Sequence, residues 1–432
     1  MIAAYPFVDQ SYKRMFDLGC TGKGELVTQL VDELHSHSNE IALDWSSLKL
    51  STISYTFNSN KATSLALSIC QPLLKDQPLT LALFQRIQDS FAHPINPQHE
   101  STDVLNNIKG SELYAITLIS TDGLSLGIIV QVLSSIASLK KKHHVCSIKT
   151  LSDPDKEPAT AIDVIVRIES AASKNSAEVL SALRSIMYQL GSSHRIDITA
   201  QFENVFRRHK RLFVFDMDST LIQQEVIDEI ARHAGIVDQV SRITESAMRG
   251  EIDFRDSLQQ RVLLLKGHPA SILDEIRSSI VFSPGVKDLC VALKRLGCKL
   301  AVISGGFLPL ARYVQAELRL DYAFANNLKV TDDGKHFAGS TSGPVVDASR
   351  KAELLTVIAQ AELIDHMDQV VAVGDGANDL QMMTAAGLGI AYNAKPKVQQ
   401  QADARINQPS MLHVLYLMGL QWKEIQDLLQ MN

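Results

Sequence analysis

The sequence predicts an α/β protein in which a doubly wound parallel sheet with a helical cap is preceded by a smaller α+β domain. Three observations predict this class. From residue 211 short apolar strands alternate with helices, which is typical of a parallel sheet covered on both faces. Residues 223–280 are helical by periodicity and contain no strand pattern. Residues 110–202 have a different order of predicted strands and helices, which indicates a separate domain.

Length and composition exclude several classes of protein. At 432 residues the chain is long enough for two or three domains. Its net charge of −6 gives no general attraction to nucleic acid or to membranes, and no apolar run approaches the roughly 20 residues of a membrane span. Five scattered cysteines without a CxxC pair are typical of reduced thiols, and the first residues do not have the pattern of a signal peptide. We therefore expect a cytoplasmic protein.

The first half of the chain predicts two segments. Residues 1–105 are poorly readable, and a degenerate copy of the module that follows is one hypothesis for them. In residues 110–202 the order βαββαβ predicts a ferredoxin-like sandwich. Its strands and helices are expected at Leu113–Ser120, Leu126–Leu139, His144–Leu151, Ala161–Ile168, Ser176–Leu190 and Ile196–Gln201. This pattern resembles an ACT domain, a module that often senses amino acids beside metabolic enzymes. A module that only joins subunits or acts as a spacer is an equal alternative.

The second half, residues 208–432, predicts the doubly wound sheet and its cap at about 223–280. The expected strands are Arg211–Phe215, Lys299–Ile303, Gln369–Val373 and Leu388–Tyr392. The expected helices between them are Val286–Leu296, Leu308–Leu318 and Ala352–Glu362. A helical insertion directly after the first strand would cover the carboxyl end of the sheet like a lid.

Two carboxylates, Asp216 and Asp218, directly follow the first strand. Carboxylates beside a buried apolar strand are costly unless a positive charge neutralises them. A divalent cation would do so, and ligands of open α/β sheets bind at the carboxyl ends of the strands. This stretch therefore predicts metal-assisted chemistry at that edge of the sheet.

Three further polar motifs follow later strands or begin the next helix. They are Ser304-Gly305-Gly306, Lys351, and the run Gly374-Asp375-Gly376-Ala377-Asn378-Asp379. Each alone has a plain interpretation as a turn, an ordinary loop or a solvated lysine. Because the carboxyl ends of neighbouring parallel strands converge on one crevice, their joint placement favours a single site.

The chemistry of these motifs is complementary. A carboxylate can attack a phosphoryl group and form an aspartyl-phosphate, and a second carboxylate can protonate the leaving oxygen and then activate water. Asp375 adds a third acid, and Mg²⁺ prefers such oxygen ligands. Lys351 and the hydroxyl and amides around Ser304 and Gly305 offer donors to phosphoryl oxygens.

Residues 211 to about 420 resemble the haloacid dehalogenase (HAD) superfamily of aspartate-nucleophile phosphatases, and within it the phosphoserine phosphatases. This resemblance implies a HAD-like Rossmannoid core. It is carried by Asp216–Leu221, Glu225–Ile230, Arg261–Lys266, Ser304–Phe307, Asp321–Asn326 and Val373–Leu380.

The resemblance implies a role for each matched residue. Asp216 would be the nucleophile and Asp218 the general acid/base. Mg²⁺ would be held by the carboxylates of Asp216 and Asp375 and the backbone carbonyl of Asp218. Asp379 would support these ligands without binding the metal itself. The residues expected to bind substrate are Asp216, Asp218, Glu225, Arg261, Ser304, Gly305, Lys351 and Asn378.

Glu225 and Arg261 in the expected cap also make independent physical sense. An arginine can clamp a carboxylate with two hydrogen bonds while a glutamate pairs with an ammonium group, so together they suit a zwitterionic amino acid. By themselves they would be interpreted as surface residues of two helices. Met248 and Phe254 fall where the family lines the lid with apolar side chains, and core packing accounts for them equally well.

The implied activity is hydrolysis of O-phospho-L-serine to L-serine and phosphate, the last step of L-serine biosynthesis. A HAD phosphatase or phosphotransferase for another small phosphomonoester is the alternative. An amino-acid-binding regulator without catalysis is the other alternative, but such a protein has no need of Asp216, Lys351 and Asp375 together. L-serine as a feedback ligand and a homodimer are hypotheses attached to the ACT-like domain.

Overall fold

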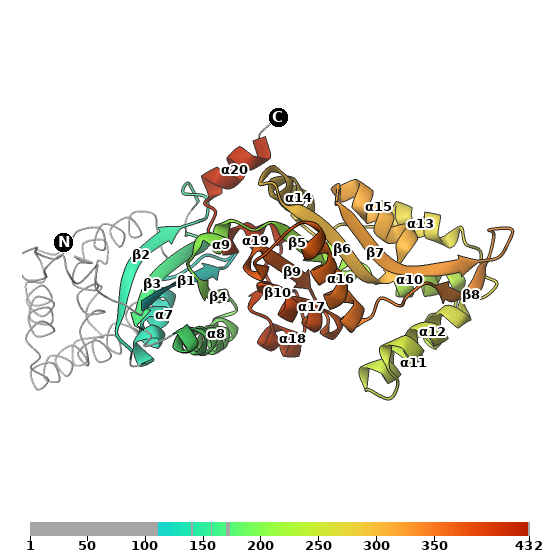
Figure 1. Cartoon of the computed structure of the whole chain (residues 1–432), viewed down its shortest axis with the longest axis horizontal. Coiled ribbons are helices and arrows are strands. Elements are labelled where there is room, and N and C mark those ends of the chain that lie inside the picture. The colour runs from blue at the N-terminus through green and yellow to red at the C-terminus, as the bar shows by residue number, and fades with distance from the viewer. Residues whose placement is uncertain (1–110, 140, 157, 170–172, 431–432) are drawn as a thin grey trace, which may run out of the picture. The chain divides into compact units, whose positions relative to one another are not determined.

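A computed structural model describes residues 111–430, apart from residues 140, 157 and 170–172 (Figure 1). The hypothesis for residues 1–105 lies outside this range. The chain forms two compact units. One contains the described residues up to Asn204 together with Gly419–Lys423, and the other contains Val205–Met418 and the residues from Glu424.

The first unit is a four-stranded antiparallel sheet with two helices. Its elements follow one another as β1 (Ser111–Ile119), α7 (Leu126–Ser138), β2 (His143–Thr150), β3 (Ala161–Glu169), α8 (Ser173–His194) and β4 (Asp197–Phe202). The strand order is β2-β3-β1-β4, which is the order of a ferredoxin-like sandwich. The predicted βαββαβ sequence of elements is confirmed, and each predicted element lies within a few residues of its observed position.

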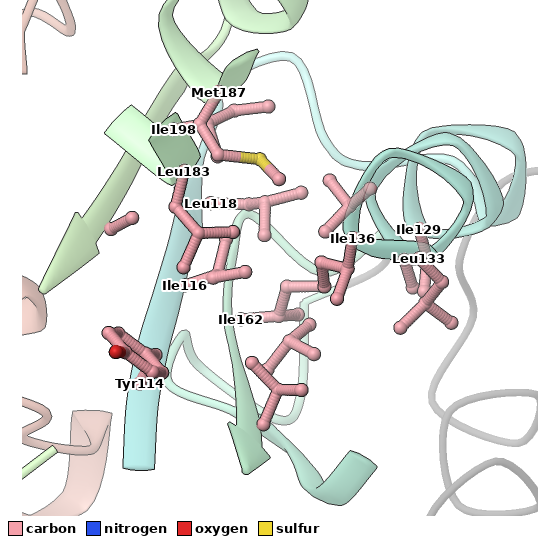
Figure 2. Packing of buried hydrophobic residues seen from close by; sticks show 14 of the residues in the cluster. Tyr114, Ile116, Leu118, Ile129, Leu133, Ile136, Ile162, Leu183, Met187 and Ile198 are labelled. Atoms are coloured by element: carbon pink, nitrogen blue, oxygen red, sulfur yellow. The ribbon is translucent and has the colours of Figure 1, made fainter. Parts of the chain in front are cut away.

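The core of this unit lies between the sheet and its helices. Alternate residues of β1 point toward the helices, as the period of two requires, and Figure 2 shows Tyr114, Ile116 and Leu118 among side chains of α7 and α8. Leu183 and Met187 of α8 are fully buried there. The apolar pattern that predicted the strands therefore also determines which face of the sheet the helices cover.

The second unit is built on a seven-stranded sheet in the order β11-β10-β9-β5-β6-β7-β8. The strands are β5 (Leu212–Phe215), β6 (Lys299–Phe307), β7 (Tyr322–Val330), β8 (Phe337–Ser342), β9 (Val370–Gly374), β10 (Leu388–Tyr392) and β11 (Ala404–Ile406). Neighbours from β11 to β7 run parallel, and β8 pairs antiparallel with β7. The predicted doubly wound sheet is confirmed, with an antiparallel edge strand that the apolar pattern did not predict.

β5 lies in the middle of this sheet because its side chains need cover on both faces. Leu212 and Val214 pack into one cluster with residues of α16 (Ala348–Ala361) and α17 (Leu380–Ala385). Phe213 and Phe215 lie on the opposite face, where their ring centroids are 6.1 Å apart. All four side chains are fully buried. A strand that is apolar on both faces is expected at the centre of a parallel sheet.

The remaining helices include the cap and the helices between later strands. The cap consists of α10 (Val226–Ala234), α11 (Val237–Met248), α12 (Phe254–Leu264) and α13 (Ile272–Ser279) (Figure 1). The helices between later strands are α14 (Val286–Arg295), α15 (Leu308–Leu318) and α18 (Pro396–Gln401). Short helices α9 (Val205–Arg208), α19 (Val414–Leu417) and α20 (Trp422–Gln430) complete the described range. No helix in the described ranges combines the length and apolarity needed to cross a membrane.

Two connectors join the cap to the sheet domain, and they pair with each other. Ile222 and Phe282 form an antiparallel bridge, and the Gln223 amide donates to the Val281 carbonyl at 2.9 Å. The Gln224 side chain extends the pairing: its amide nitrogen donates to the Ser279 carbonyl at 2.9 Å and its oxygen accepts from the Val281 amide at 3.1 Å. These connectors form the hinge ribbon, residues 222–224 and 279–282.

Candidate active site

The predicted motifs meet at the carboxyl ends of β5, β6 and β9. Asp216 follows β5, and its backbone amide donates to the Val373 carbonyl at the end of β9. Ser304 lies near the end of β6, and Asp375 follows β9. Lys351 lies in the first turn of α16, which begins three residues before the lysine and earlier than predicted. The site therefore occupies the edge of the sheet that the topology predicts.

Lys351 joins two of the predicted acids. Its ammonium group lies 2.7 Å from Asp216 Oδ1 and 2.6 Å from Asp379 Oδ1, and its side chain is 1% exposed. The two carboxylates raise the pKa of Lys351 although burial acts to lower it, so the lysine is charged. It is thus a fixed positive charge between two acids.

The turn after β5 contains Asp218, and the residue that follows it has a strained backbone. Ser219 has φ of +54°, a left-handed conformation that is costly for a residue with a Cβ atom. Asp218 Oδ1 is buried and has no hydrogen-bond partner among the described residues. An unsatisfied buried oxygen of this kind points to a missing partner, and a substrate or water oxygen would be one.

Carboxylates outnumber cations in this cluster. Oxygens of Asp216, Asp375 and Asp379 all lie within 4.8 Å of one another. Burial, and then the charge of Asp379, raises the pKa of Asp216 well above its usual range and that of Asp375 to about 7. One lysine does not balance three acids and Asp218, so the donor set fits a divalent cation with oxygen ligands.

The two oxygens of Asp379 already have partners. Oδ1 accepts from Lys351, and Oδ2 accepts from the Gly376 amide at 3.1 Å. Asp375 has a weaker contact, from the Thr220 hydroxyl at 3.4 Å. Asp216 and Asp375 are therefore better placed than Asp379 to give oxygens to a cation.

Ser304, Gly305 and Gly306 were predicted as a loop after the strand, but they lie inside β6, at an irregularity between Ile303 and Phe307 that is held from both sides. The Ser304 side chain is fully buried, and its hydroxyl accepts from the Gly306 amide at 2.8 Å. Asn326 donates to the Gly305 carbonyl at 2.8 Å and accepts from the Val346 amide at 2.9 Å. Asn326 thus ties the predicted phosphate loop to the segment that leads into α16.

Glycine at position 306 is required by close packing. A Cβ atom there would lie 2.9 Å from Asp218 Oδ2 and 3.0 Å from Ser304 Oγ. These distances are shorter than ordinary van der Waals contact. A side chain would displace both groups, which places Asp218 beside this loop.

The cap brings Glu225 and Arg261 toward the same cluster. Glu225 precedes α10 and accepts from the Ser219 hydroxyl at 2.7 Å. Arg261, on α12, donates from Nε to the Ser257 carbonyl at 3.2 Å. Burial lowers the pKa of Arg261, and the charges of Asp228, Glu225 and Asp218 oppose this effect, so its guanidinium lies near carboxylates from both cap and core.

The structure also places the two predicted lid residues, Phe254 and Met248, and the predicted phosphate ligand Asn378. The ring of Phe254 lies over Gly305, since a Cβ atom on that glycine would be 3.1 Å from Phe254 Cζ. Met248 is the last residue of α11. Asn378 lies in the short turn Ala377–Asp379, which follows Asp375 after one residue, Gly376.

Sequence reasoning did not single out three residues that complete the site. Asn326 was only part of a matched motif; it is a buried residue inside β7, and its role needed the structure. Asp228 lies three residues after Glu225, one turn along α10, and that spacing would have indicated it. Thr220 is fully buried beside Asp375, and its role as a donor needed the structure.

Comparison with known proteins places this geometry in a family. Residues 210–387 match the haloacid dehalogenase-like hydrolases. The chain is 48% identical over 242 residues to a probable phosphoserine phosphatase of Schizosaccharomyces pombe, which covers 56% of this chain and 81% of that protein. The chain belongs to the phosphoserine phosphatase family.

Further relatives agree with this placement. The phosphoserine phosphatase of Saccharomyces cerevisiae is 42% identical over 279 residues, covering 64% of this chain and 88% of the yeast protein. The structure of a probable phosphoserine phosphatase of Vibrio cholerae covers 76% of this chain and 96% of its own, with 29% identity and a TM-score of 0.51. The phosphoserine phosphatase fold therefore accounts for the sheet domain and cap.

Proposed function

We propose that the protein is a Mg²⁺-dependent phosphoserine phosphatase that hydrolyses O-phospho-L-serine to L-serine and phosphate. The observation that carries this proposal is the buried Asp216, held 2.7 Å from Lys351 at the end of the central strand, below a cap that carries Glu225 and Arg261. The core supplies a nucleophile and charge for phosphoryl transfer. The cap supplies one anion and one cation for an amino acid.

In the first step a carboxylate oxygen of Asp216 attacks phosphorus. The bond between phosphorus and the serine oxygen breaks, and Asp218 gives its proton to that oxygen. Burial, and then the charge of Glu225, raises the pKa of Asp218, which suits a carboxyl group that must carry a proton before the step. The products of this step are L-serine and phospho-Asp216.

In the second step the carboxylate of Asp218 takes a proton from water, and the water oxygen attacks the phosphorus of phospho-Asp216. The acyl phosphate bond breaks, and this releases phosphate and restores the Asp216 carboxylate. Lys351 and the groups of Ser304, Gly305 and Asn378 hold the phosphoryl oxygens through both steps.

The cation site fits the donors described above. Mg²⁺ would be held by the carboxylates of Asp216 and Asp375 and the backbone carbonyl of Asp218, while Asp379 supports Lys351. When bound, the ion would neutralise phosphoryl charge beside these acids. The excess of buried carboxylates over cations supports this assignment.

Recognition of the substrate's amino-acid part is assigned to the cap. Arg261 would bind the carboxylate with two hydrogen bonds, and Glu225 would pair with the ammonium group. Asp228, whose charge reaches Arg261, would hold that guanidinium in place. The alternative of another small phosphomonoester would leave this pair without a ligand of matching charge.

The proposal is tested by phosphate release from a panel of phosphomonoesters, with and without Mg²⁺. We expect O-phospho-L-serine to be the best substrate, with loss of turnover after removal of divalent cations. Asp216→Asn should abolish turnover and retain the fold. Arg261→Ala should reduce turnover of phosphoserine much more than that of an aryl phosphate. Equal losses for both substrates would overturn the zwitterion assignment, and substantial activity of Asp216→Asn would overturn the covalent mechanism.

A regulatory role for residues 110–202 is a separate proposal. The ferredoxin-like order of this unit, shared with ACT-like modules, supports L-serine as a feedback ligand or a homodimer interface. Either role would act on the phosphatase domain without contributing catalytic groups.

A further inference from the structure

Besides the hinge ribbon, the cap contacts the core at β8, where the Gly267 amide donates to the Phe337 carbonyl at 2.9 Å, and at an ion pair beside the site. Arg255, the second residue of α12, donates from Nε to Asp347 Oδ2 at 2.6 Å, and its Nη2 lies 2.6 Å from the same oxygen. Asp347 belongs to the core, directly before α16. The Arg255 side chain is 66% exposed, whereas that of Asp347 is 14% exposed. A largely exposed cap cation is thus paired with a largely buried core anion.

Asp347 has a second task in the core. Its other oxygen, Oδ1, accepts from the Arg350 amide at 2.9 Å and caps the N-terminus of α16. Lys351 is the next residue of that helix. Partial burial acts to raise the pKa of Asp347, but the hydrogen bonds from the Arg350 amide and from Arg255 hold it below its usual range. One charged carboxylate therefore joins the cap to the helix that carries the phosphate-binding lysine.

The residues beside this pair also meet across the boundary. Phe254 precedes Arg255 and lies over Gly305 of the phosphate loop. Val346 precedes Asp347, and its amide donates to Asn326, which also holds the Gly305 carbonyl. Two consecutive cap residues thus contact the loop and the helix start that bind phosphate.

We propose that Arg255 and Asp347 form a latch that holds the cap closed over the bound substrate. They are positioning residues: neither is assigned to touch the substrate, and they act by keeping cap-borne Glu225 and Arg261 over the core. The proposal rests on the proposed function. A surface cleft of 240 Å³ beside the pair, lined among others by Arg255, Asp347 and Arg350, opens it to solvent and ions. The latch is therefore reversible and sensitive to salt.

The test compares matched variants in steady-state kinetics with O-phospho-L-serine and an aryl phosphate. Arg255→Ala removes the latch. Asp347→Asn removes its charge but can still cap α16, because asparagine is a good N-cap residue. Arg249→Ala is the control, since Arg249 pairs with Glu245 and Glu251 inside the cap and with no core residue among those the structure describes.

We expect Arg255→Ala and Asp347→Asn each to raise KM for phosphoserine by about 1.5-fold to fivefold, the range of a partly exposed ion pair, with a smaller change in kcat. The double variant should be no worse than the more affected single variant, because both remove one interaction. Arg255→Lys should recover part of the loss. KM for the aryl phosphate, which offers no partner to Glu225 or Arg261, should change little, as should both substrates with Arg249→Ala.

Salt gives a readout that a merely structural role would not change. Wild-type KM for phosphoserine should rise with added NaCl more steeply than that of Arg255→Ala, because the variant has no latch to screen. Wild-type kinetics in Arg255→Ala, additive losses in the double variant, or equal salt slopes would overturn the latch. Failure of the proposed function is distinct, because the wild type itself would then not hydrolyse phosphoserine.

Discussion

At the scale of single residues, close packing fixes the acids of this site, and it does not allow a larger side chain beside them. Gly374 ends β9, and a Cβ atom on it would lie 2.5 Å from the Asp379 carboxylate. Asp379 in turn accepts from Lys351 and the Gly376 amide. The glycine is thus required by an acid five residues later in the chain.

Gly374→Ala should therefore displace Asp379 and, through it, Lys351. We expect kcat to fall by at least about tenfold, the usual scale for misplacing a charged group in an active site. Far-ultraviolet circular dichroism should stay close to that of the wild type, because an alanine suits a strand end. Wild-type kcat in this variant would show that Asp379 does not fix the lysine.

His413 gives a residue-scale prediction for stability. It stacks on Tyr416 with ring centroids 5.6 Å apart, and burial lowers its pKa from 6.5 to about 4. The unfolded chain therefore binds a proton between about pH 6.5 and pH 4 that the folded chain does not. Folding stability is fully present above that window and falls as pH decreases through it.

The shift corresponds to at most about 3 kcal/mol lost between pH 6.5 and pH 4. His413→Gln, which does not titrate there, should flatten this part of the pH dependence. Urea unfolding at several pH values measures it, and the difference between wild type and variant separates His413 from the carboxylates. Parallel pH curves for the two proteins would contradict the assignment.

The residues with a visible chemical pattern were predicted, and those defined by packing were not. Asp216, Asp218, Ser304, Lys351 and Asp375 do come together at one sheet edge, as their places after strands indicated. Asn326 was not assigned a role, because its two backbone partners are 21 and 20 residues away in the chain. Spacing along a sequence does not encode such distant partners.

At the scale of elements, the hinge ribbon determines how the cap is attached. Gln224 acts as an extra unit of strand pairing, since its side-chain amide donates to one backbone group and accepts from another. Its neighbour Gln223 makes one side-chain hydrogen bond, to the Phe282 carbonyl at 3.3 Å. The two glutamines are therefore a matched pair for testing the ribbon.

Gln224→Ala should loosen the ribbon, and we expect faster limited proteolysis at the connectors and a higher KM for phosphoserine. Gln223→Ala should have a smaller effect on both, because it removes one longer bond. Loss of a hydrogen bond of this kind costs about 1 kcal/mol, so a change in KM of about fivefold is the expected scale. Equal behaviour of the two variants would exclude a special role for Gln224.

Elements with strong periodicity were predicted well. The cap was predicted as one helical span without strands, and the strands β5, β6, β9 and β10 follow the sequence pattern closely. β7 and the edge strand β8 were not predicted, because exposed and half-buried residues interrupt their apolar pattern. An antiparallel edge pair needs only one covered face.

At the scale of the whole molecule, the chain passes from the first unit to the second and returns. Gly419–Lys423 belongs to the first unit, where the Trp422 amide donates to the Leu151 carbonyl at 2.7 Å and Lys156 lies 5.9 Å from the centre of the Trp422 ring. Residues near the carboxyl end thus contribute to a unit formed mainly by residues far earlier in the chain.

The proposed feedback by L-serine is tested at this scale. A chain starting near Glu203 should keep phosphatase activity but lose inhibition by L-serine if the first unit binds the effector. Inhibition assays at fixed phosphoserine concentration measure this, with the full chain as the control. Unchanged inhibition would instead indicate binding of the product at the active site.

The strand order of the second unit has a consequence for how the chain folds. β5 pairs with β6 and β9, so residue 212 must find residues 299 and 370. During synthesis β5 leaves the ribosome before either partner exists, and its four apolar side chains stay without cover until most of the domain has been made. Contacts of such long sequence separation fold slowly, so refolding of this unit should be slower than that of the first and more prone to aggregation.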